Sequence, residues 1–181
     1  MTGAGGSIGH EQVQRSAPDG YTILATTTST HISAPFLVKK LPYDPYKDVT
    51  PITAAVDAVT VLAVNPAMPV NNVRELVDYL RKYPGKVSYG SAGIGNGQHL
   101  AGVLFSQKAG VEMLHVPYKG GGPVLTAVLG GEVHINFPGA SVAVPHIKSG
   151  KLRGIGFTGD KRISSLPDLP TIAESGLPDF N

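Results

Sequence analysis

Short strand-like and helix-like segments alternate along this chain, and that alternation constrains the fold more than any other feature of the sequence. Apolar and β-branched runs predict strands at residues 21–25, 52–56, 59–64, 87–89, 114–116, 134–137 and 152–157. Helices are predicted between several of them, at residues 73–83, 97–109 and 124–129. This order is typical of an α/β domain with a largely parallel sheet.

The helix boundaries carry recognisable capping signals. Asn72 is a favourable N-cap with Glu75 three residues later, and the apolar positions that follow recur at helical spacing. Gly110 is favourable at the position directly after a helix, where the backbone is often left-handed, and Pro123 is favourable in the first turn of a helix. The first of these helices should bury one stripe, formed by Val73, Leu76, Val77 and Leu80.

Composition narrows the class of protein. With 23 Gly and 15 Pro among 181 residues, turns and loops are unusually frequent. There is no Cys, so disulfides and thiolate metal sites are excluded. A net charge of +2 without a long basic run argues against a nucleic-acid partner. No apolar run reaches the ~18 residues of a membrane span, and the first residues do not have the pattern of a signal peptide.

Pro-rich connections suggest where the chain passes between structural units. The segment NPAMP at residues 65–69 cannot continue a central strand. Residues 66–153 have a helix to cover each strand and are expected to form a complete α/β unit. Residues 1–65 and 154–181 contain long Pro-rich connections and too few elements for an independent sheet.

The glycine-rich stretches do not match nucleotide-binding motifs. A dinucleotide fingerprint needs glycine where the chain has Ile8 or Gln98. Each Gly-Lys pair precedes Val87 or Leu152, where a P-loop has the hydroxyl residue that reaches Mg²⁺. Nucleotide hydrolysis is therefore not predicted.

Catalytic and metal-binding patterns are also missing from the sequence. Gln14 stands where a zinc-binding helix would place a second histidine after His10. Tyr89 is too bulky for the strained turn of a nucleophile elbow around Ser91. The six His lack i, i+4 spacing and are interpreted as surface or capping imidazoles. The sequence predicts no catalytic residue, no metal site and no cofactor.

Residues 90–96 form a flexible, glycine-rich loop between a predicted strand and a predicted helix. Backbone amides at such a helix start, together with the helix dipole, favour an anion such as a carboxylate. The same glycines can also serve only as a tight turn, and the sequence leaves both interpretations open. The hydroxyl-rich run at residues 26–30 similarly can contact a polar ligand or cap the next helix, and capping is the simpler reading.

Several short sequence segments, in their order along the chain, resemble those of the extracytoplasmic solute receptors of tripartite tricarboxylate transporters, the Bug receptors of the TctC type. They are GAGGSIG (3–9), APDGYT (17–22), LPYDP (41–45), YGSAGIG (89–95), HLA (99–101), HVPYKG (115–120), GKLR (150–153) and LPTIAESGLP (169–178). Essentially the whole chain is covered.

The resemblance implies a type II periplasmic-binding-protein fold, in which two α/β lobes close on a ligand. It implies a periplasmic, monomeric receptor that captures a small organic carboxylate and presents it to membrane permease subunits without catalysing a reaction. Compared with the family pattern, the chain is expected to be truncated at both ends, with residues 1–65 a partial first lobe, 66–153 a complete second lobe and 154–181 a return to the first. A cytoplasmic effector domain of the LysR type is the alternative, although no helix-turn-helix is evident.

The expected ligand site combines the glycine-rich loop with residues facing it and with neighbouring loops at the carboxyl ends of the strands. Lys119 is either a steering charge or an ordinary solvated lysine. The predicted ligand-binding residues are Ser91, Gly93, Gly95, Asn96, Gly97, Thr28, Ser29, Thr30, Lys119, Pro138 and Gly139.

Overall fold

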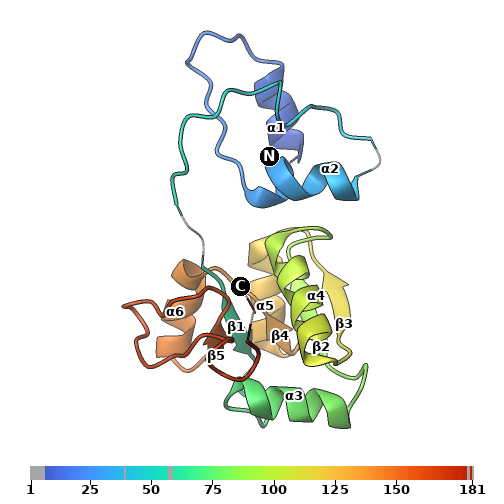
Figure 1. Ribbon diagram of the computed structural model, residues 1–181, viewed down its shortest axis with the longest axis vertical. Helices are drawn as coiled ribbons and strands as arrows, with labels where there is room; N and C mark the ends of the chain where they lie inside the picture. Colours follow the sequence, from blue (N-terminus) through green and yellow to red (C-terminus); the bar gives the residue numbers. More distant parts are fainter. Residues whose placement is uncertain (1–6, 39, 57–58, 179, 181) are drawn as a thin grey trace.

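A five-stranded mixed sheet organises the larger part of the molecule (Figure 1). The computed structural model describes residues 7–38, 40–56, 59–178 and 180. The strand order is β3-β2-β4-β1-β5, with β2 parallel to β3 and β4, and β1 antiparallel to β4 and β5. The strands are β1 Val61–Val64, β2 Ser88–Ser91, β3 Leu114–Pro117, β4 Ile135–Asn136 and β5 Arg153–Phe157. The predicted α/β class is confirmed, but the sheet is mixed and not largely parallel, because β1 pairs antiparallel with both of its neighbours.

Helices connect the strands and cover the sheet. The three predicted helices are present as α3 Val73–Lys82, α4 Gly97–Ala109 and α5 Gly121–Gly130. Asn72 Oδ1 accepts the Glu75 amide at 2.9 Å, as its N-cap role requires. Gly110 ends α4 with φ +62°, a conformation that favours glycine. A fourth helix, α6 Ala140–Lys148, was not predicted, and it contains Pro145 in its interior.

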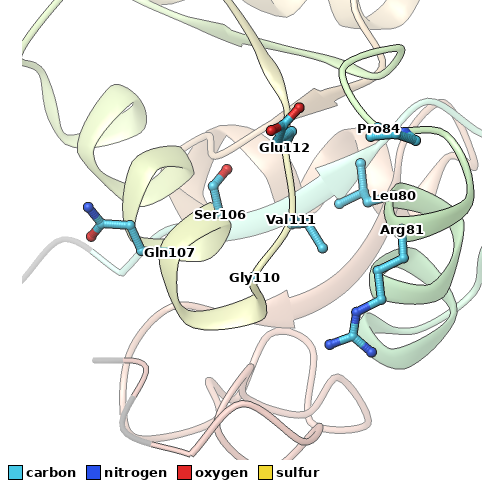
Figure 2. A pocket seen from close by; sticks show the side chains of 8 residues that line it. All are labelled: Leu80, Arg81, Pro84, Ser106, Gln107, Gly110, Val111 and Glu112. Carbon is cyan, nitrogen blue, oxygen red and sulfur yellow. The ribbon is translucent and has the colours of Figure 1, made fainter.

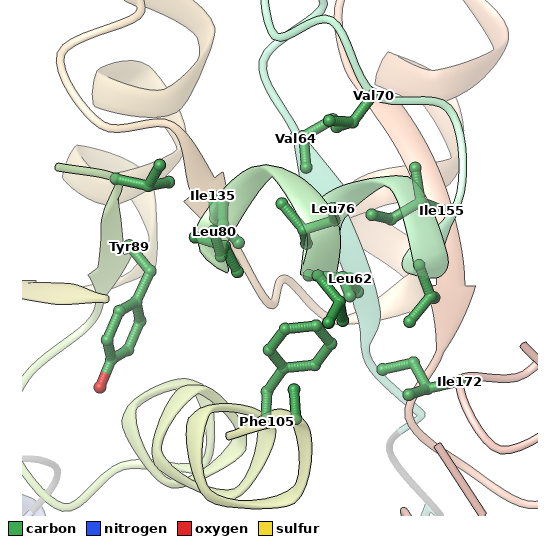
Figure 3. Close-up of a cluster of buried hydrophobic side chains, with 14 of the residues drawn as sticks. Leu62, Val64, Val70, Leu76, Leu80, Tyr89, Phe105, Ile135, Ile155 and Ile172 are labelled. Atoms are coloured by element: carbon green, nitrogen blue, oxygen red, sulfur yellow. The ribbon is translucent and has the colours of Figure 1, made fainter. Parts of the chain in front are cut away.

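Two hydrophobic clusters lie on opposite faces of the sheet because neighbouring strand residues point to opposite sides. Leu62 belongs to the cluster that packs against α3 and α4, whereas Val61 and Ala63 belong to the other cluster, against α5 and α6. Figure 3 shows the first cluster, in which Phe105 of α4 lies against the sheet residues. Each buried Leu, Ile or Phe contributes about 1.5–3 kcal/mol to folding.

Residues 7–56 contain helical segments and long connections. The helices are α1 Ser7–Gln14, the π-helical turn η2 Ser29–Ser33 and α2 Ala34–Leu37. The strands predicted at 21–25 and 52–56 are not formed, which corrects the sequence interpretation. Both segments have strand-like residues, but neither has a strand beside it to complete a ladder within the part of the chain that is described.

The sheet also takes in strands from outside the range 66–153. β1 precedes that range, and β5 begins at its last residue and runs beyond it. The two strands pair antiparallel from Val61 with Phe157 to Val64 with Arg153, with a register shift between Leu62 and Ala63. The lobe boundaries at 65/66 and 153/154 stay a prediction. Among the residues described, no helix combines the length and apolar character that crossing a membrane requires.

Candidate functional site

Three parallel strands end at one edge of the sheet, and a helix begins after each of them. We call the loops at residues 91–97, 117–121 and 137–140 the carboxyl edge. They join β2 to α4, β3 to α5 and β4 to α6, with N-caps Asn96, Gly120 and Gly139. Helix N-termini carry unpaired amides and partial positive charge, so this edge is the natural place for an anion.

The β2–α4 loop uses most of its amides internally. Ala92 donates its amide to Gln98 Oε1 at 2.8 Å, and Gly95 donates to His99 Nδ1 at 3.1 Å. The Gly93 amide donates to Ser91 Oγ at 3.3 Å, and the Asn96 amide to the Gly93 carbonyl at 3.4 Å. Of the predicted anion-binding amides, those of Gly93, Gly95 and Asn96 therefore bind the protein itself.

Open amides remain at the first turns of α4 and α5. Within the described ranges, the amides of Gly97 and Gln98 have no acceptor, and neither do those of Gly121 and Gly122. Gly120 has φ +120°, and as a glycine it brings no side chain over these donors. At α6, by contrast, Ala140 donates to the Val59 carbonyl at 2.9 Å, so that helix start is partly occupied.

Ser91 is a buried structural residue in this arrangement. Its hydroxyl donates to the Gly93 carbonyl at 3.1 Å and lies 2.7 Å from His115 Nε2. With His115 in the Nε2–H tautomer, the hydroxyl accepts from the imidazole and from the Gly93 amide, and its capacity is used in full. The predicted direct contact of Ser91 with a ligand has no free hydrogen-bonding position to support it.

The rings of Tyr89, His99 and His115 pack together beside the β2–α4 loop. The His115 ring lies 4.2 Å from that of His99 and 4.9 Å from that of Tyr89, centroid to centroid. Burial lowers the pKa of both histidines, and the neighbouring His99 lowers the pKa of His115 further. Burial also raises the pKa of Tyr89. These histidines stay neutral near pH 7, and neutral His99 can accept the Gly95 amide. Sequence reasoning missed this role because i, i+4 spacing does not reveal contacts between elements.

The hydroxyl residues around η2 divide into different roles. Thr30 is buried and its hydroxyl lies 2.8 Å from that of Thr26, with further bonds to Thr27, so it is used in local capping. Thr28 is the N-cap of η2 but forms no side-chain cap, and it is exposed, while Ser29 is half-buried. Whether Thr28 and Ser29 face the ligand remains a prediction.

One contact links the segment around η2 and α2 to the carboxyl edge. Gly95 has φ +80°, and a Cβ built on it would lie 2.6 Å from Leu37 Cδ1. Leu37, the last residue of α2, therefore packs directly over the backbone of the β2–α4 loop. Only glycine at this position permits that approach together with the left-handed backbone.

The remaining predicted site residues lie at the other two loops of the carboxyl edge. Lys119 follows β3 and is exposed, which suits either a steering charge or a solvated lysine. Pro138 is buried, and its carbonyl accepts the Val61 amide at 2.9 Å. Gly139 is the half-buried N-cap of α6. Asn96 caps α4 through Oδ1, which accepts the His99 amide at 2.9 Å, so its side chain is also committed to the fold.

Two shallow hollows lie away from the carboxyl edge. The larger, of about 540 Å³, lies between the carboxyl ends of α3 and α4 and is lined in part by Arg81, Ser106 and Glu112 (Figure 2). Helix carboxyl ends carry partial negative charge and the Glu112 carboxylate offsets the positive charge of Arg81, so this hollow is less favourable for an anion than the carboxyl edge. A second hollow of about 440 Å³ lies along residues 165–169 and the end of α6. No cluster of three or more potential metal ligands occurs among the residues described.

Comparison with known proteins gives a consistent result over the whole chain. Residues 1–181 match the family model described as "Tripartite tricarboxylate transporter family receptor", TctC. Protein BugT of Bordetella pertussis is 33% identical over 179 residues, which are 98% of this chain and 55% of BugT. The chain thus spans about half the length of this curated relative.

Solved structures agree in fold over nearly all of the chain. The R. palustris protein Rpa4515, determined with adipate, is 34% identical with a TM-score of 0.94, covering 97% of this chain and 59% of that one. MatC from Rhodopseudomonas palustris, determined with bound malate, is 31% identical with a TM-score of 0.89, covering 99% of this chain and 61% of that one.

Proposed function

Because the chain belongs to the tripartite tricarboxylate transporter receptor family, we propose that it takes part in capturing a small organic acid in the periplasm for membrane permease subunits. The carboxylate is held at the carboxyl edge by main-chain amides of α4 and α5. The family assignment supports the role of receptor, and the geometry of the helix starts supports the place and charge of the ligand.

The observation that carries the proposal is the pair of open helix N-termini. Gly97 and Gln98 begin α4, and Gly121 and Gly122 begin α5, all with amides that lack acceptors in the described chain. The strands that precede these helices, β2 and β3, are parallel neighbours, so both starts lie at one edge. Two amide pairs and two dipoles match the two oxygens and the negative charge of one carboxylate.

Main-chain amides recognise only the carboxylate, so the rest of the ligand is selected by how well its shape fits the surrounding site. Adipate and malate, the ligands of the two R. palustris proteins, are both dicarboxylates of different length and polarity. We propose the same class for this chain. Lys119, exposed beside the start of α5, adds a positive charge that attracts such anions to the edge.

The buried Ser91–His115 pair does not favour an enzyme. A nucleophilic serine needs its hydroxyl directed at a substrate, with a base ready to accept the proton. The Ser91 hydroxyl is buried and donates to the Gly93 carbonyl instead. This supports the proposed binding role, and incubation with candidate acids should yield no new products by chromatography.

A thermal-shift panel tests the proposal. Adipate and malate are compared with adipamide, which matches adipate in shape but carries no charge. A ligand at 100 times its dissociation constant stabilises the folded state by about 2.7 kcal/mol. Stabilisation by an acid but not by adipamide is expected, whereas equal responses, or none to any acid, would contradict the carboxylate assignment.

A further inference from the structure

His99 lies in the first turn of α4 and holds the loop that precedes this helix. Its backbone amide is capped by Asn96 Oδ1 at 2.9 Å, and its ring turns back so that Nδ1 accepts the Gly95 amide at 3.1 Å. A ring nitrogen can accept a hydrogen bond only while it carries no proton. The neutral imidazole therefore holds Gly95, and the imidazolium cannot.

The residue held in this way is one on which another segment rests. Gly95 is buried, has φ +80° and lies under Leu37 of α2. A proton on Nδ1 would set two N–H groups against each other, so the Gly95 amide would have to turn away. The protonation state of His99 therefore acts on the backbone of the β2–α4 loop.

The surroundings of His99 disfavour its protonation while the site is without a ligand. The helix packs against β2 and β3, and the titratable side chains that face His99 from these strands are Tyr89 and His115. Leu37, above the loop, is uncharged. Burial lowers the pKa of His99, and no carboxylate of the described chain contributes to raise it. A second positive charge on His115, with ring centroids 4.2 Å apart, would add repulsion.

A bound carboxylate changes this balance. The amides of Gly97 and Gln98, which have no acceptor among the residues described, lie in the same helical turn as His99. The helix dipole disfavours a cation at this end, whereas a carboxylate placed there attracts one. Carboxylate and proton therefore favour each other, and by reciprocity each raises the affinity for the other by the same factor.

We propose that His99 is a positioning residue that couples capture of the acid to uptake of a proton. In the neutral form its ring holds the Gly95 amide; in the protonated form it releases this amide and adds a positive charge at the start of α4. The coupling rests on the proposed binding of a carboxylate at the carboxyl edge, and it makes capture tighter at mildly acidic pH.

Titration calorimetry with malate and with adipate tests the coupling. Affinities are compared at about pH 8 and about pH 6, where the carboxyl groups of the free acids are still largely ionised. Affinity should be at least about threefold higher at the lower pH. At the lower pH, binding heats in buffers of different ionisation enthalpy should show a net uptake of protons.

Two variants assign the proton to a residue. His99→Gln keeps a side-chain acceptor for the Gly95 amide but takes up no proton, so the ratio of the two affinities should fall to about one and the proton uptake should disappear. His146→Gln is the matched control, since His146 lies in the last turn of α6, at the end of that helix remote from the carboxyl edge. It should keep both the affinity ratio and the proton uptake.

A pH titration of the ligand-free protein by NMR adds a readout that needs no acid. The Gly95 amide signal should move with the titration of the His99 ring, and His99→Gln should abolish this movement.

The outcomes distinguish the coupling from the binding on which it rests. Equal affinities at the two pH values, release of protons, or an uptake that His99→Gln leaves in place would overturn the coupling and leave the proposed function standing. Failure of both acids to bind at either pH would overturn the proposed function and the coupling with it.

Discussion

Ser91 Oγ and His115 Nε2 lie 2.7 Å apart beneath the loop that leads into α4. The two residues come from adjacent parallel strands, β2 and β3, and the hydroxyl also binds both polar backbone atoms of Gly93. One buried hydroxyl therefore fixes the turn of the loop and the orientation of an imidazole. This makes Ser91 a positioning residue for the carboxyl edge.

Ser91→Ala should destabilise the protein by about 1–3 kcal/mol, because it leaves the His115 ring and the Gly93 backbone without their buried partner. Urea unfolding at neutral pH measures this as a lower midpoint with an unchanged slope. Affinity for a carboxylate should fall less than stability does. An unchanged midpoint would show that water or another group replaces the hydroxyl.

Asn96→Asp should separate folding from binding. Aspartate caps a helix as well as asparagine does, and its charge interacts favourably with the dipole by about 0.3–1 kcal/mol, so stability should be kept or raised. The same charge at the start of α4 should repel a bound carboxylate and weaken its affinity about tenfold or more.

Asn72→Asp is the matched control for this effect. Asn72 caps α3 through the same kind of bond, from the Glu75 amide to Oδ1 at 2.9 Å, but outside the carboxyl edge. Its Nδ2 also donates to Glu75 Oε1 at 2.7 Å, so the two variants are compared in affinity and not in stability. Its aspartate variant should keep the wild-type affinity, measured by titration calorimetry with adipate or malate. Equal losses of affinity in both variants would indicate a general effect of negative charge, and no loss in either would place the anion elsewhere.

Stability should fall as the pH is lowered from about 6.5, the ordinary pKa of histidine. Burial lowers the pKa of His99 and His115 in the folded state, so the unfolded chain binds protons first and the folded state loses stability until its own pKa values are passed. Above that range both histidines are neutral in the folded and in the unfolded chain, so their contribution to stability no longer changes with pH.

His115→Gln should reduce the slope of stability against pH in the acidic range while leaving part of it. His99 and His10 retain their own contributions in this variant, since burial lowers the pKa of both; the neighbouring His31 lowers the pKa of His10 further. Urea midpoints from about pH 7.5 to about pH 5 measure the slope. An identical slope in wild type and variant would contradict a proton-linked role for His115.

Gly102→Ala should destabilise the first hydrophobic cluster by about 1–3 kcal/mol through overpacking. A Cβ at this position of α4 would collide with the buried Tyr89 ring. Gly130→Ala, at the end of α5, meets no atom within 4 Å and serves as the control, with stability unchanged or raised by up to about 1 kcal/mol. Similar midpoints for the two variants would show that Tyr89 moves aside freely.

The sequence was a good guide where local signals and tertiary structure agree. Asn72 and Gly110 mark helix ends because capping depends on neighbouring residues, and five of the predicted strands lie in the observed sheet. Residues 21–25 and 52–56 have strand composition, but a strand exists only with a partner, which local pattern does not reveal. The helix α6 was missed because Pro145 and a weak polar pattern conceal it.

The sequence predicted the elements around the candidate site but not the hydrogen bonds within it, and the ligand-binding residues stay a prediction. The glycine-rich loop does lie between a strand and a helix start, as its sequence indicated. The sequence did not show that Gln98 and His99 would turn back and accept the amides of Ala92 and Gly95. That use of donors moves the expected anchor from the loop to the first turns of α4 and α5.

The most direct test of the central claim is an amide-resolved NMR titration of the protein with adipate and malate. The account predicts the largest shifts at the amides of Gly97, Gln98, Gly121 and Gly122, which have no acceptor among the residues that the structure describes. Shifts concentrated instead around Glu112 and Gly110, in the hollow between α3 and α4, or no shifts with either acid, would contradict it.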